Sequence, residues 1–135
     1  TITPASGYVG PVGGLCIGMV AGVLCFFAVN FVKRTLKVDD ALDVLAVHGV
    51  GGATGVLLTA IFGATAFGGI GLSEKTIADQ LLVQLIGLAA TLIWAAAGSF
   101  IILKAVKALV GLRVDEEEEI EGLDLVEHGE KGYEL

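Results

Sequence analysis

Charged side chains are scarce in this 135-residue sequence, and most of them lie near its C-terminal end. They make up 17% of the chain, whereas about a quarter of the residues of a soluble domain are charged. Residues 1–110 hold five acidic and six basic side chains, a net charge of +1, and residues 111–135 hold ten acidic and two basic ones, a net charge of −8, which together give −7. The acidic balance therefore belongs to the tail, and it argues against nucleic acid as a partner.

Residues that could carry catalysis or bind metals are also few. The sequence has two cysteines, Cys16 and Cys25, whose spacing in an apolar run fits neither a metal site nor a redox motif. Small buried thiols are common in packed helices, so we expect a structural role for both. No nucleophile–base set, metal-ligand cluster or phosphate-binding loop is visible. We therefore expect no enzymatic activity, no metal and no cofactor.

Long apolar runs dominate the rest of the chain, which is 55% hydrophobic with a mean hydropathy of +0.85. Three runs, at residues 13–32, 44–62 and 81–103, have the length of roughly 20 residues that a membrane-spanning helix needs. They are rich in Ala, Leu and Gly without alternation, and an open strand in lipid would leave its backbone groups unpaired. The sequence predicts an all-α integral membrane protein, with spans at about 10–32, 41–63 and 78–110 in a membrane portion, 1–110, and an acidic tail, 111–135.

Basic residues indicate how these helices are oriented. Three lie between the first and second runs and three follow the third, whereas the loop at 63–80 has only Lys75 (Lys33, Arg34, Lys37; Lys104, Lys107, Arg113). Basic residues concentrate on the cytoplasmic side of a membrane. We therefore expect the first loop and the tail in the cytoplasm, and the glycine-rich loop outside.

Small residues recur at intervals of four in two of the runs, at Gly14, Gly18 and Gly22 and again at Gly51 and Gly55. This spacing lets helix backbones approach closely, and we interpret it as packing within a bundle. Three helices with such faces would leave packing surface unfilled. Because the chain also begins abruptly at Thr1, we expect it to be part of a larger protein.

His48 is the candidate functional residue of the membrane portion, because it lies inside the second run in the stretch DVLAVHGVGGATG. Ionisable groups within membrane helices are costly and often mark a pathway. A neutral imidazole donates from one nitrogen and accepts at the other, which suits a path for protons or ammonia. The alternative is a core histidine hydrogen-bonded to a neighbouring helix, and the residue alone does not decide between them.

Three carboxylates stand where the second helix is expected to begin. Asp39 or Asp40 fits a helix cap, in which the carboxylate accepts unpaired backbone N–H groups. Asp43 lies one turn further in and five residues before His48. Both helix-end electrostatics and a position lining the vestibule remain open for Asp43.

The tail combines a run of acids, DEEEE, with the more specific pattern GLDLVEHGEKGY. A run of acids alone is typical of a solvated face. The glycines, apolar residues and tyrosine of the second pattern are unusual for a disordered acidic tail, and we interpret them as a segment that docks on the cytoplasmic face. For His128, a surface polar residue is the simpler interpretation.

Taken together, these strings resemble the Amt/Mep family of ammonium transporters. The resemblance covers essentially the whole chain: ITPASGYVG, LKVDDALDVLAVHGVGG, LLVQL, and then GLRV followed by EGLD, HGE and a tyrosine. It implies an eleven-helix bundle assembled as a homotrimer in the plasma membrane, multi-pass, with a cytoplasmic C-terminus. The chain would be a C-terminal fragment that supplies the end of the eighth helix and the last three.

The resemblance also implies roles for individual residues. His48 would be the second member of a histidine pair in a hydrophobic pore, with ammonium as the substrate, and Asp40 would have a structural role at the start of the tenth helix. The tail would be regulatory and contact the neighbouring subunit, and a PII-type signalling protein would bind the cytoplasmic face. The tail residues concerned are Gly122, Leu123, Asp124, His128, Gly129, Glu130 and Tyr133. An ammonium sensor of the same family, or a structural membrane subunit, are the alternatives.

Overall fold

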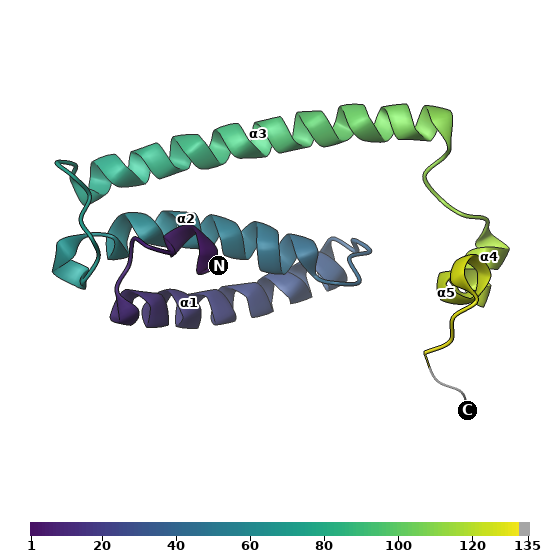
Figure 1. The fold of residues 1–135 in the computed structure, drawn as a ribbon, viewed down its shortest axis with the longest axis horizontal. Coiled ribbons are helices and arrows are strands. Elements are labelled where there is room, and N and C mark those ends of the chain that lie inside the picture. The colour runs from purple at the N-terminus through teal and green to yellow at the C-terminus, as the bar shows by residue number, and fades with distance from the viewer. Residues whose placement is uncertain (133–135) are drawn as a thin grey trace. The chain divides into compact units, whose positions relative to one another are not determined.

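The computed structural model describes residues 1–132, and over that range the chain is helical, with no strands (Figure 1). The predicted all-α class is confirmed. The elements, in chain order, are η1 (Thr3–Ala5), α1 (Pro11–Asn30), η2 (Phe31–Thr35), η3 (Leu45–Val50), α2 (Gly51–Phe62), η4 (Thr65–Phe67), α3 (Ile77–Leu109), α4 (Glu116–Glu121) and α5 (Leu123–His128). Two of them, η2 and η3, are π-helical: η2 continues α1, and η3 leads directly into α2.

Three continuous helical stretches are long and apolar enough to cross a membrane, as predicted: Pro11–Thr35, Leu45–Phe62 and Ile77–Leu109. The 33 residues of α3 correspond to a length of about 50 Å at 1.5 Å per residue, against a hydrocarbon core of about 30 Å. No residue of α3 is buried. A helix of this composition and exposure requires lipid or further protein around it.

Local sequence signals explain where the membrane helices begin. Pro11 is the first residue of α1, where its missing N–H has no helical partner to lose. Before α3, the Thr76 hydroxyl donates to the Asp79 carboxylate at 2.7 Å and accepts from the Asp79 N–H at 3.1 Å. The carboxylate in turn accepts the Thr76 N–H at 3.2 Å. This reciprocal arrangement resembles a capping box, and it sets the start of α3.

The chain divides into two compact units, Thr1–Leu92 and Ile93–Leu135. In the first, α1 packs along η3 and α2 as an antiparallel pair (Figure 1). The face of α1 that is buried there contains Gly13, Ile17 and Ala21. At Gly18 and Gly22, on the neighbouring face, an added β-carbon would meet nothing within 4 Å beyond its own stretch of helix. The buried stripe on α1 therefore lies one position before the glycine stripe that the sequence predicted as the packing face.

Gly51 and Gly55 of α2 make the close approach that their spacing predicts. Both are buried. A β-carbon at position 51 would lie 2.6 Å from Thr1 Oγ1 and 3.0 Å from Cys25 Sγ, and one at position 55 would collide with the Thr1 carbonyl group. The chain start, α1 and α2 therefore meet around these two glycines.

The second unit contains the acidic tail. Arg113 forms a bidentate ion pair with Glu119 of α4, at 2.6 and 2.7 Å, and α4 packs against α5. Gly122 separates the two short helices with a φ of +105°, a conformation open essentially to glycine. The tail is thus locally structured.

We predict that Gly55→Ala destabilises the first unit by about 1–3 kcal/mol, the usual effect of inserting a methyl group into a packed site. Gly52→Ala is the matched control, because it lies on the same helix and a β-carbon there would meet nothing within 4 Å. Thermal unfolding of the purified chain in detergent, followed by circular dichroism, measures the difference. Equal midpoints for the two variants would contradict the close approach of Thr1 to α2.

Candidate functional site

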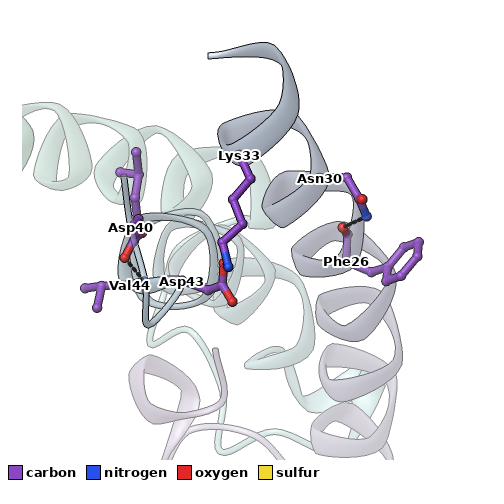
Figure 2. A network of polar contacts seen from close by, with 7 residues as sticks. Phe26, Asn30, Lys33, Asp40, Asp43 and Val44 are labelled. Atoms are coloured by element: carbon purple, nitrogen blue, oxygen red, sulfur yellow. Dashed lines mark hydrogen bonds and ion pairs between the residues drawn. The ribbon is translucent and has the colours of Figure 1, made fainter. Parts of the chain in front are cut away.

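The polar groups of the first unit gather where the second membrane helix begins, in the turn between η2 and η3 (Figure 2). Asp40 accepts hydrogen bonds from two backbone N–H groups, that of Val44 at 2.9 Å and that of Leu45 at 2.7 Å. These are N–H groups of the first helical turn, which have no carbonyl partner within the helix. The sequence offered Asp39 or Asp40 for this position, and the structure places Asp40 there.

The same hydrogen bonds act on the ionisation of Asp40. The N–H groups of Leu45 and Val44, in that order, hold the pKa of the Asp40 carboxyl below its usual value, and the nearby charge of Lys33 acts in the same direction. Hydrogen bonds and a positive charge both favour the ionised form of a carboxylate. Asp40 is therefore ionised at neutral pH and complements the positive end of the helix dipole.

Asp43 points to a different partner. Its carboxylate lies 2.9 Å from Lys33 Nζ, which comes from the end of the preceding helix (Figure 2). Its backbone has a φ of +56°, a region that Asp and Asn enter more readily than other non-glycine residues. The ion pair between Lys33 and Asp43 was not predicted from the sequence. The sequence feature that could have predicted this ion pair is a lysine before, and an aspartate near the end of, the turn that joins the two helices.

His48 lies in the π-helical segment η3, five residues after Asp43, and its side chain is exposed. Among the described residues, no hydrogen bond or ion pair involves the His48 imidazole, although its backbone carbonyl accepts the Gly51 N–H. The wider π-helical turn was not predicted from the sequence. Single π-helical turns within α-helices occur frequently at functional sites.

The structure brings Lys33, Asp40 and Asp43 together at the start of the second membrane helix, with His48 further along that helix. The predicted tail residues belong to the other unit. There, Gly129 ends α5 with a φ of +64°, and the Glu130 N–H donates to the Asp124 carbonyl at 3.0 Å. Leu123 and His128 are the first and last residues of α5, and Tyr133 lies outside the described residues. Within residues 1–132, no three His, Cys, Asp or Glu side chains are grouped so as to hold a metal ion.

Comparison with known proteins gives this geometry its context. Residues 1–133 match the model of the Ammonium Transporter Family. The chain belongs to the ammonium transporter family. It is 45% identical over 134 residues to an "Ammonium transporter" of Aquifex aeolicus, 40% over 134 residues to one of Bacillus subtilis, and 44% over 135 residues to "Ammonium transporter Amt1" of Archaeoglobus fulgidus.

These alignments cover 98–99% of the chain but only 31–34% of each relative. The chain thus spans about a third of the length of the curated relatives it matches. The surfaces exposed on this chain, including the one that carries His48, therefore belong to only one part of a family member.

We predict that Asp40→Asn lowers the thermal midpoint at pH 7 and reduces its dependence on acid pH. Because the folded-state pKa of Asp40 is lowered, the stabilisation is fully present above the unfolded-state value of about 3.9. It is lost as the pH falls through the folded-state value. Melting curves between pH 7 and pH 3 measure both effects. Asp39→Asn, which removes a neighbouring charge, should retain the wild-type pH profile, and identical profiles for the two variants would refute the cap.

Proposed function

We propose that this chain forms part of an ammonium transporter and that His48 lines its pore. The observation that carries the proposal is a single ionisable side chain, His48, in the apolar helix Leu45–Phe62 of a chain that belongs to the ammonium transporter family. Placing an ionisable group in such a segment costs free energy, so its presence favours a role in conduction. Its exposure on this chain supports a position facing the remainder of the protein.

The chemistry of the substrate explains why a histidine serves in this position. An ammonium ion entering an apolar pore would lose hydration that the walls do not replace. Release of its proton removes that penalty, and neutral ammonia crosses more easily. A histidine pair, in which His48 is the second member and the first comes from outside this chain, offers donors and acceptors along the path. Potassium has no proton to lose and is excluded.

The orientation and assembly of the protein follow from the same proposal. The Lys33–Lys37 turn and the tail lie in the cytoplasm, in accordance with their basic flanks, and the complete protein is a homotrimer in the plasma membrane. In the tail, Leu123, Leu125 and Val126 of α5 are 36–44% exposed. Apolar side chains on a short helix support docking of the tail on a neighbouring subunit and a role for a PII-type protein at this face.

We predict that methylammonium uptake requires both the remainder of the protein and His48. Transport-deficient cells would express the chain alone, and the chain joined to the part of the Aquifex aeolicus relative with which it does not align. Only the joined protein should transport, and His48→Ala should reduce its rate at least about tenfold, the scale of a lost pathway group. Val50→Ala, two residues along the same helix, should retain transport. Normal uptake by His48→Ala in the joined protein would refute the proposal.

The orientation is tested separately by cysteine labelling. In the joined protein with Cys16 and Cys25 replaced by alanine, Glu74→Cys should react with a membrane-impermeant maleimide on intact cells. Val38→Cys should react only after the cells are opened, because the basic turn is cytoplasmic. Both positions are exposed in the structure. The reverse pattern would contradict the proposed orientation.

A further inference from the structure

Two contacts join α1 with its extension η2 to the second membrane helix, one on each side of His48. On one side, Lys33 Nζ pairs with the Asp43 carboxylate at 2.9 Å. On the other, Cys25 lies against Gly51, where a β-carbon would be 3.0 Å from its sulfur. His48 is in the segment between these contacts.

The two contacts share one antiparallel register. Cys25 and Lys33 are eight residues apart on α1 and its extension η2, and Asp43, in the turn just before the second membrane helix, is eight residues before Gly51. The contacts are therefore mutually consistent, and they attach the intervening π-helical segment at both ends.

The carboxylate of Asp43 is not needed to cap this helix, since Asp40 already accepts the N–H groups of Val44 and Leu45. Instead, the Asp43 carbonyl accepts the Val47 N–H at 2.8 Å, while its side chain reaches Lys33. The ion pair is thereby connected directly to the helical turn that precedes His48.

The partial exposure of the pair indicates what it contributes. The side chains of Lys33 and Asp43 are 42% and 29% exposed, and ion pairs in contact with solvent contribute little to global stability. The ion pair can instead fix where the start of the π-helical segment lies against the preceding helix. Such a position matters, because a displacement of about 1 Å in a functional group can lower a rate strongly.

We propose that Lys33 is a positioning residue for His48. Through Asp43 it fixes the start of the π-helical segment, while the contact between Cys25 and Gly51 fixes its end. This inference rests on the proposed function only for its effect on transport. The orientation of position 48 can be measured independently.

The first experiment measures uptake kinetics in the joined protein, normalised to the amount in the membrane. Lys33→Gln should lower the maximum methylammonium uptake rate about tenfold, with an apparent KM within about twofold of wild type, because position rather than binding is changed. Asp43→Asn should have the same effect, the double variant should show no further loss, and Lys33→Arg should restore the rate. Arg34→Gln is the matched control: it removes an adjacent positive charge, and Arg34 has no ion pair among the described residues.

The second experiment reads the position of residue 48 without transport. In a His48→Cys protein whose Cys16 is alanine and whose Cys25 is serine, which keeps a γ-atom against Gly51, the rate of modification by a small methanethiosulfonate should change severalfold on Lys33→Gln and stay constant on Arg34→Gln. If transport proves independent of His48, the proposed function fails, whereas the labelling result still decides the positioning role. Equal labelling rates in the Lys33 and Arg34 variants, or loss of Lys33→Gln from the membrane, would overturn the inference.

Discussion

The close approach of α1 and α2 is the contact on which the first unit depends. Lipid offers no hydrophobic drive for two apolar helices to associate, so van der Waals packing must supply it. Gly51 and Gly55 bring the backbone of α2 against Thr1 and Cys25, and Ile17, fully buried on the facing side of α1, completes the packing. Once this approach is set, the turn between the helices and the segment that contains His48 have little freedom left.

At the polar end of the same helix pair, two carboxylates have different roles. Asp40 satisfies backbone N–H groups of its own helix, and Asp43 joins that helix to the preceding one. Interchanging the roles would leave either the helix start or the interhelical contact unpaired. Both carboxylates lie outside the buried core, so neither carries the large desolvation cost of a buried charge. Partly exposed interactions of this kind contribute little to global stability. Their effect is to orient the start of the helix locally.

Features set by local sequence could be predicted, and features set by tertiary contact could not. The three apolar helices, the cap at Asp40 or its neighbour, and the small face at Gly51 and Gly55 each follow from composition or spacing. The sequence favoured Gly14, Gly18 and Gly22 as the packing face of α1, whereas Gly13, Ile17 and Ala21 are buried. The choice between adjacent faces depends on the partner helix, which periodicity does not specify. The ion pair between Lys33 and Asp43 and the π-helical turn were missed for the same reason.

The exposure of His48 is the feature that most constrains how this sequence acts. An imidazole facing hydrocarbon would leave its ring nitrogens unpaired, at a cost that a membrane protein avoids by pairing the group or lining a cavity with it. The described part of the chain supplies neither a hydrogen bond nor an ion pair for the His48 imidazole. In the proposed pore, the surface facing His48 comes from the roughly two thirds of a family member's length with which this chain does not align. In the function proposed above, the ring would meet ammonia only if it is correctly placed, and the antiparallel packing of α1 against η3 and α2 is what would place it.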